Sequence, residues 1–130
     1  MHASTDLEFD SVFARVARLR AGGLVIGGDP FFNSRAEQLG AASIHHAVPA
    51  IYQLRTFAVA GGLVSYGADL SDSYRQVGVY VGRILNGEKP GDLPIQRASK
   101  VEMIINLKTA KALGLSLPLS LLGRADEVIE

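Results

Sequence analysis

Polar and aromatic side chains follow the short apolar runs of this sequence, and they are the residues most suited to chemistry. Asp29 and Phe31 come after the run at residues 24–26, and Tyr66 closes the run at residues 63–66. A carboxylate and a phenol form hydrogen bonds with a small molecule, and an aromatic ring stacks on its planar parts. These residue types favour ligand binding over covalent catalysis.

A purely structural interpretation of these residues also stays open. Asp29 can cap a turn while the rings of Phe31 and Phe32 pack into the core. Asp69, shortly after Tyr66, is typical of a residue that caps the helix that follows it. On the residues alone, the capping interpretation of Asp69 is favoured.

A further group of polar residues follows the apolar run at residues 48–52. Gln53, Arg55 and Thr56 lie there. An arginine at the end of a strand can bind a carboxylate through two parallel hydrogen bonds. Exposed loop arginines are also common without a ligand, so this signal is weak when taken alone.

The sequence gives no support for enzymatic or metal-dependent chemistry. It contains no cysteine, which excludes disulfides, thiolate metal sites and a cysteine nucleophile. The glycine patterns of dinucleotide and phosphate loops are absent, as is the Gly-x-Ser-x-Gly motif of serine hydrolases. His45 and His46 are adjacent, so on a helix they point about 100° apart and are not expected to chelate as an i, i+4 pair would. We predict no enzyme activity, no cofactor and no metal site.

The bulk composition is typical of a single globular domain. Lys plus Arg and Asp plus Glu both number 13 in the 130 residues, so no net charge favours nucleic-acid binding. No apolar run approaches the roughly 20 residues that span a bilayer. The first residues lack the basic and apolar regions of a signal peptide, so the chain, if expressed as given, is expected in the cytoplasm.

Apolar runs alternate with amphipathic segments, which predicts an α/β fold with a short, mostly parallel sheet flanked by helices. Helices are expected at residues 6–19, 34–46, 71–85, 107–113 and 120–125, with a helical turn at 56–60. Strands are expected at residues 24–26, 48–52, 63–66 and 101–105, with a further short strand at the extended residues 95–96. Ser4, Thr5 and Asp6 offer N-caps for the first helix, and the strand at 24–26 is expected to be buried on both faces.

Strings spread over almost the whole chain resemble one protein family. The central string is AGGLVSYG at residues 60–67, preceded by GDPFFNSR at 28–35 and PAIY at 49–52. After it come YRQVG at 74–78, GRILNGEKP at 82–90, DLPIQ at 92–96 and INLKTAKALG at 105–114. From Ser4 to Glu130 the chain resembles the C-terminal part of ABC-transporter substrate-binding proteins of the type I periplasmic-binding fold. The branch that it resembles binds tryptophan, tyrosine and related small molecules.

The resemblance implies two α/β lobes that enclose a small ligand. Residues 1–66 and 97–130 would belong to the second lobe, and residues 67–96 would form a crossover and one helix of the first lobe. Family ligand contacts map to Asp29, Pro30, Phe31, Gln53, Arg55, Thr56, Ser65 and Tyr66. The implied ligand is an amino-acid-like or aromatic solute, and the implied partner is an ABC permease. The parent family is periplasmic or membrane-anchored.

Family members are much longer, so the chain is expected to be a truncated solute-binding component of an ABC importer. The first lobe, apart from a late helix, is expected to be missing, as are the first strand and helix of the second lobe. The apolar face of the helix at 71–85 is then predicted to be covered in a homo-oligomer. The alternatives are a receiver-like or flavodoxin-like signalling domain and an assembly module without a ligand.

Overall fold

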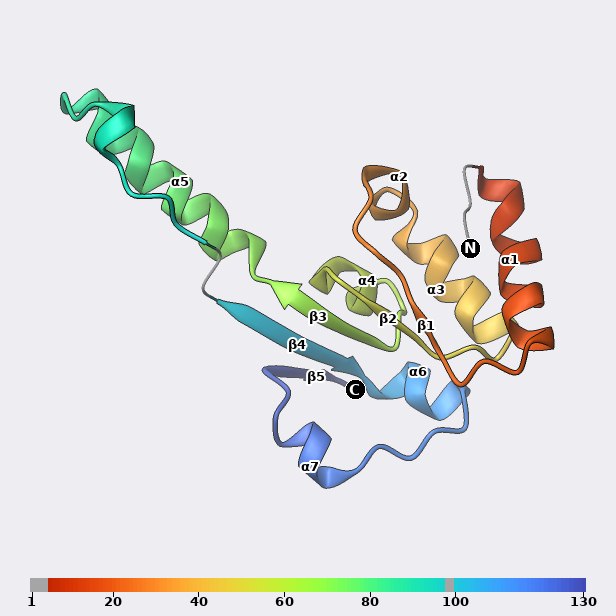
Figure 1. Ribbon diagram of the computed structural model, residues 1–130. Coiled ribbons are helices and arrows are strands. Elements are labelled where there is room, and N and C mark those ends of the chain that lie inside the picture. Colours follow the sequence, from red (N-terminus) through yellow and green to blue (C-terminus); the bar gives the residue numbers. More distant parts are fainter. Residues whose placement is uncertain (1–4, 98–99) are drawn as a thin grey trace. The chain divides into compact units, whose positions relative to one another are not determined.

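The chain divides into two compact units, which are described separately. The structure, a computed structural model, describes residues 5–97 and 100–130 (Figure 1). We call Met1–Gly67 with Glu102–Glu130 the sheet unit, and Ala68–Val101 the helix unit. The expected cap at Ser4 lies outside the described residues, whereas Thr5 stands at the N-cap of the first helix.

The described strands form one sheet in the order β1-β2-β3-β4-β5. Their bounds are β1 Leu24–Val25, β2 Ala50–Tyr52, β3 Val64–Ala68, β4 Val101–Asn106 and β5 Glu127–Ile129. The pairs β1 with β2, β2 with β3, and β4 with β5 are parallel. Asn106 N donates to Leu63 O and Asp69 N donates to Lys100 O, so β3 and β4 run antiparallel. The predicted α/β fold with a mostly parallel sheet is confirmed.

Helices connect the parallel strands, as such pairing requires. Those of the sheet unit are α1 Asp6–Arg18, α2 Pro30–Asn33, α3 Ala36–His45, α4 Arg55–Val59, α6 Leu107–Ala112 and α7 Leu119–Leu122. The chain passes through α3 from β1 to β2 and through α4 from β2 to β3. The carboxyl ends of β1, β2 and β3 therefore lie at one edge of the sheet.

The core of the sheet unit lies between α1, α3 and the strands. Phe9, Phe13 and Val16 recur at helical spacing on α1 and are all buried. They pack in one cluster with Leu39 of α3 and Tyr52 of β2, and Figure 1 shows α1 beside α3. This packing holds the strands in place, and with them the loops that follow each strand.

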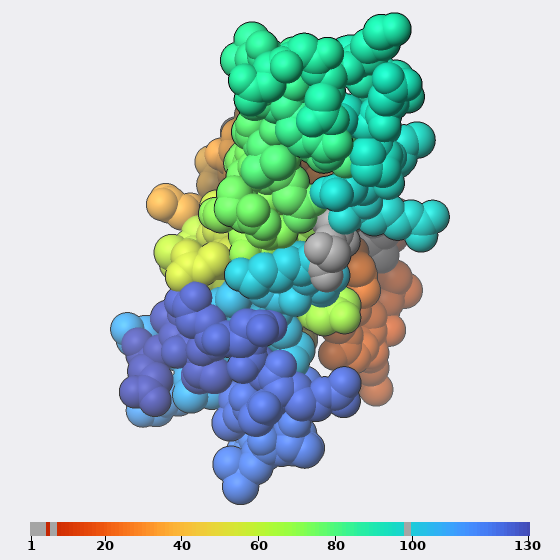
Figure 2. Space-filling view, turned by 90° about the vertical axis from the view of Figure 1, so that its left-hand side faces the viewer, coloured from red at the N-terminus to blue at the C-terminus, as the bar shows by residue number. Residues whose placement is uncertain are grey.

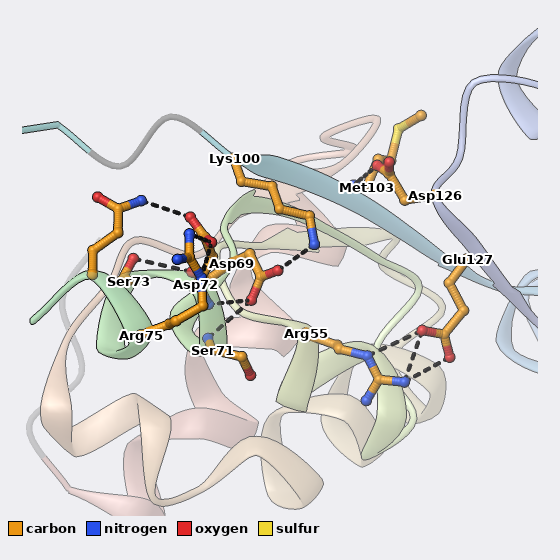
Figure 3. Close-up of polar contacts among 11 residues, drawn as sticks. Arg55, Asp69, Ser71, Asp72, Ser73, Arg75, Lys100, Met103, Asp126 and Glu127 are labelled. Atoms are coloured by element: carbon orange, nitrogen blue, oxygen red, sulfur yellow. Dashed lines mark hydrogen bonds and ion pairs between the residues drawn. The ribbon is translucent and has the colours of Figure 1, made fainter. Parts of the chain in front are cut away.

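The helix unit is built around α5 Leu70–Leu85, which is followed by the 3-10 turn η1 Pro90–Asp92. The Asp69 carboxylate accepts hydrogen bonds from Ser71 N at 2.9 Å and Asp72 N at 3.1 Å (Figure 3). Asp69 is thus the N-cap of α5, as the sequence predicts. Lys100 Nζ donates to the other Asp69 oxygen at 2.7 Å. The pKa of Asp69 is lowered below its usual value, mainly by this hydrogen bond from Lys100 and next by the hydrogen bond from Asp72 N.

One side of α5 is apolar and exposed to solvent. Its exposed residues are Leu70, Tyr74, Val77, Val81, Ile84 and Leu85. Monomeric proteins rarely keep large contiguous apolar patches on their surface. This stripe is the structural basis for the predicted self-association, which stays a prediction.

The sequence-based expectations are wrong for two of the strands. No strand forms at residues 95–96, and the Ile95 side chain is fully exposed. Pro94, which has no backbone N–H to donate, precedes it. The Val25 side chain is 79% exposed, so β1 is not buried on both faces. β1 stands at an edge of the described sheet, where fewer neighbours cover it.

Short elements were missed or misplaced. The sequence analysis did not predict α2 or β5, and α7 is shorter than the helix expected at residues 120–125. Figure 2 shows the C-terminal segment that carries α7 and β5, coloured dark blue, on the surface. Elements of three or four residues bury too little apolar surface to give a clear periodic pattern.

Candidate ligand-binding site

The candidate residues gather where loops leave the carboxyl ends of β1, β2 and β3. In open parallel sheets, ligands bind outside this edge. The segment after β1 carries Asp29, Pro30 and Phe31, the segment after β2 begins with Gln53, and Tyr66 lies in β3. The topology therefore delivers three segments, far apart in sequence, to the same edge of the sheet unit.

Gln53 is the residue on which these segments converge. A Cβ atom added at Gly28 would lie 2.0 Å from Gln53 Oε1, and one added at Gly67 would lie 2.1 Å from Gln53 O. At Gly67 any side chain would collide with the Gln53 backbone, whereas at Gly28 it would meet the end of the Gln53 side chain, which is exposed and can rotate. Gly67 therefore allows β3 to approach the backbone at Gln53 closely, and Gly28 leaves room for the Gln53 side chain beside the segment after β1.

Asp29 has a clear structural role. Its Oδ1 accepts a hydrogen bond from Phe31 N at 2.8 Å, and it caps α2, in which Pro30 is the first residue. Pro30 and the Asp29 side chain are both exposed. The capping interpretation is thus what the structure shows, and the same carboxylate stands at the candidate edge.

Phe31 is engaged in an aromatic cluster. Its ring centroid lies 5.7 Å from that of Phe9 and 5.6 Å from that of Phe32. The Arg35 guanidinium carbon lies 4.0 Å from the Phe31 ring centroid, within cation-π distance. Phe31 is only partly exposed, so it supports the loop more than it offers a free stacking surface.

Arg55 pairs with an acid from β5. Arg55 Nη2 lies 2.7 Å from Glu127 Oε1, and Arg55 Nε donates to Glu127 Oε2 at 3.1 Å (Figure 3). Hydrogen bonding to Glu127 is the main cause that raises the pKa of the Arg55 guanidinium. A ligand carboxylate would have to displace Glu127, which already takes the bidentate position. Thr56, the next residue of α4, is exposed.

Ser65 and Tyr66 are neighbours in β3 and point to opposite faces of the sheet, as strand geometry requires. The Ser65 side chain is 1% exposed, and its Oγ has no hydrogen-bond partner among the described residues. The Tyr66 side chain is 59% exposed. Of this pair, only Tyr66 can meet a solute at the surface of the sheet unit.

The sequence analysis missed three residues that shape this edge. Gly67 packs against Gln53, and Glu127 pairs with Arg55. Arg35 covers one face of the Phe31 ring. The glycine that follows Tyr66 was a visible signal for close backbone approach. Nothing in the sequence pointed to Glu127, because β5 itself was not predicted.

A separate apolar hollow of about 340 Å³ lies beside α1 and β1. Its lining includes Phe9, Phe13, Leu24, Val25 and Phe32. It carries few polar groups that would orient a solute. The candidate edge differs in that it carries an exposed carboxylate, amide and phenol, all of which can form hydrogen bonds.

Across residues 5–97 and 100–130, no helix has both the length and the apolar character needed to cross a membrane.

Comparisons with known proteins identify the family. The model of the ABC transporter substrate binding protein family matches residues 4–129, so the chain belongs to this family. Proteins of this family bind substrates and are not enzymes. No curated protein matches the chain.

Solved structures share the fold. A conserved domain protein from Vibrio cholerae O1 biovar El Tor is 25% identical with a TM-score of 0.84, over 97% of this chain and 42% of that chain. An ABC domain from Streptococcus pneumonia, in complex with L-Trp, is 24% identical with a TM-score of 0.85, and the match covers 99% of this chain and 43% of that chain. A ligand-free, open substrate-binding protein with adhesive properties from Clostridium difficile is 20% identical with a TM-score of 0.70, and the match covers 98% of this chain and 42% of that chain. The chain thus spans less than half the length of these proteins.

Proposed function

We propose that this chain supplies one wall of the solute-binding cleft of an ABC importer's substrate-binding protein. The observation that carries the proposal is that Gly28, which follows β1, and Gly67 of β3 both lie against Gln53, which follows β2. This arrangement presents several exposed polar groups at the edge where α/β sheets bind ligands. Family membership favours solute capture over a signalling or assembly role.

The residues divide by their contacts into those that meet the solute and those that support them. Asp29, Gln53, Thr56 and Tyr66 are exposed and would contact the solute. The Tyr66 phenol would stack on it and form a hydrogen bond, and the Gln53 amide would donate or accept one. Three other residues would stabilise the conformation of the edge without contacting the solute. These are Phe31, which Arg35 covers, Arg55, which pairs with Glu127, and the buried Ser65.

The proposed solute is an aromatic amino acid or a compound of similar shape. The exposed Tyr66 ring and the mixed carboxylate and amide groups suit a molecule with a planar part and a charged ammonium group. The similar Streptococcus structure is a complex with L-Trp, which makes L-tryptophan the first probe.

Solute capture would follow from closure of two lobes around the ligand. The sheet unit would act as the second lobe, and α5 would belong to the first. Binding energy would shift the equilibrium between open and closed arrangements. The closed form would then dock on an ABC permease outside the cytoplasm, and a homo-oligomer would cover the apolar stripe of α5.

Saturation-transfer NMR with L-tryptophan tests the proposal on this chain. The chain contains no tryptophan, so the indole signals belong to the ligand alone. With one wall of the cleft, we expect a dissociation constant near about 1 mM, or about −4 kcal/mol. The Tyr66→Ala variant should lose most of the transfer.

The control for this experiment is Tyr74→Ala. Tyr74 is 72% exposed on α5, against 59% for Tyr66, so the two substitutions remove similarly exposed phenols. Tyr74→Ala should leave the transfer unchanged. Equal transfer in the two variants, or none in the wild-type chain at millimolar ligand, would contradict the proposal.

A further inference from the structure

A second cluster of polar side chains lies where α3 ends. It joins Asp10 of α1 to His45, the last residue of α3, and to His46, its C-cap. The end of α3 leads into β2, so this cluster is near the amino ends of the strands. The candidate ligand edge lies at their carboxyl ends, so the two sites are distinct.

These three side chains can present ligand atoms to one point. One atom from each, a carboxylate oxygen or an imidazole nitrogen, lies within 4.8 Å of the others. Asp10 Oδ1 and His46 Nε2 are 2.7 Å apart. The His45 and His46 rings meet edge to face, with centroids 4.8 Å apart and planes at 84°.

The His46 ring is held in place before any ligand binds. It stacks on Phe13, with centroids 6.3 Å apart and planes at 18°, and Phe13 is 2% exposed in the core. The His46 side chain is 14% exposed, whereas the Asp10 side chain is 76% exposed. His45 is also exposed. The His46 side chain is thus fixed by packing, whereas the exposed side chains of Asp10 and His45 can change their rotamers.

We propose that Asp10, His45 and His46 form a surface site for a divalent transition cation, with Zn²⁺ the best fit. Two imidazoles and one carboxylate are a common zinc ligand set, with a water molecule in the fourth position. Zinc bonds of about 2.0–2.2 Å place tetrahedral ligand atoms about 3.3 Å apart. The widest pair must therefore close by roughly 1.5 Å, which side-chain rotation of the exposed His45 and Asp10 can supply.

Two adjacent histidines of a helix point about 100° apart, so they are not expected to chelate a metal by themselves. Asp10, which lies 36 residues before His46 in the sequence, adds a third ligand. The two rings nevertheless meet edge to face at the end of α3, where His46 is the C-cap. The observed proximity of the two rings and the addition of Asp10 as a third ligand remove the objection.

Calorimetric titration with ZnCl₂, at neutral pH and without chelating buffer, tests this site. We expect one Zn²⁺ per chain, with micromolar affinity. His45→Ala and Asp10→Asn should each weaken binding about 10-fold or more. Mg²⁺ should not bind, because it prefers oxygen ligands and octahedral geometry.

His2→Ala is the matched control, since the chain contains just three histidines. It should leave the zinc affinity unchanged. Circular dichroism of each variant without metal should match the wild type, because Asp10 and His45 are exposed. Wild-type affinity in both site variants, loss of binding in His2→Ala, or no binding at up to about 1 mM Zn²⁺ would each overturn the proposal.

Discussion

Replacement of Gly67 by alanine should destabilise the sheet unit and distort the candidate edge. The new Cβ would lie 2.1 Å from Gln53 O and 3.1 Å from Gln53 C. Carbon and oxygen atoms in close contact are normally about 3.3–3.6 Å apart, so the ends of β2 and β3 must separate by more than about 1 Å. Both atoms of Gln53 belong to the backbone, so no side-chain rotation relieves the collision.

Overpacking of this kind typically lowers the free energy of unfolding by about 1–3 kcal/mol. For a chain of this size, that corresponds to a fall in Tm of about 4–12 °C. Urea unfolding followed by circular dichroism measures the first quantity, and a thermal scan measures the second. Saturation transfer from the same variant to L-tryptophan should also decline.

Gly78→Ala provides the matched control. Gly78 lies inside α5, and an added Cβ would meet no atom within 4 Å. Alanine favours a helix interior over glycine by up to about 1 kcal/mol, so this variant should be equally or more stable than the wild type. If Gly67→Ala were as stable as Gly78→Ala, the close approach of β3 to Gln53 would be refuted.

Two further predictions concern stability at high pH and association. Burial raises the pKa of the Tyr52 phenol to about 12 from its usual 10.0, so the unfolded chain releases this proton first. The stability that Tyr52 contributes is complete below pH 10, falls by up to about 1.4 kcal/mol per pH unit above it, and is lost near pH 12. Urea unfolding at several pH values between 10 and 12 measures this fall in the free energy of unfolding, and Tyr52→Phe should make the fall less steep. An equally steep fall in the variant would contradict the prediction. The exposed stripe of α5 should drive self-association at high micromolar concentration, and Val77→Asp should shift light scattering toward a monomer, whereas a monomeric wild type would contradict this.

The longer helices were predictable because their signals are local. The apolar residues of α5 repeat at helical spacing, and Asp69 stands directly before its first turn. The prediction of a helix at residues 71–85 therefore differs by one residue from the observed Leu70–Leu85. Periodicity and capping depend on neighbours within a few positions, which the sequence displays directly.

Elements held by distant partners were not predictable in this way. β5 has three residues, and it pairs with β4 through Ile105 opposite Val128 and Asn106 opposite Ile129. Its stability comes from this pairing and not from its own pattern. The absence of a strand at residues 95–96 has the same origin, because an extended segment becomes a strand only where a partner edge exists.

The candidate site shows the same division. The strand ends indicated which segments reach the candidate edge, so the positions of Asp29, Gln53 and Tyr66 at that edge were predictable from the sequence. The partner that occupies Arg55 was not, because Glu127 lies 72 residues further along the chain. The burial of Ser65 and exposure of Tyr66 likewise depend on which face of β3 the helices cover.

We propose above all that the carboxyl edge of β1, β2 and β3 is the solute-binding surface. Mapping of amide chemical shifts during titration with L-tryptophan tests it most directly, since each segment reports separately. We expect the largest saturable changes at Gly28, Gln53, Tyr66 and Gly67, with little change along α5. Saturable changes centred instead on the apolar hollow around Phe9 and Phe13, or no change at the Gln53 segment, would contradict it.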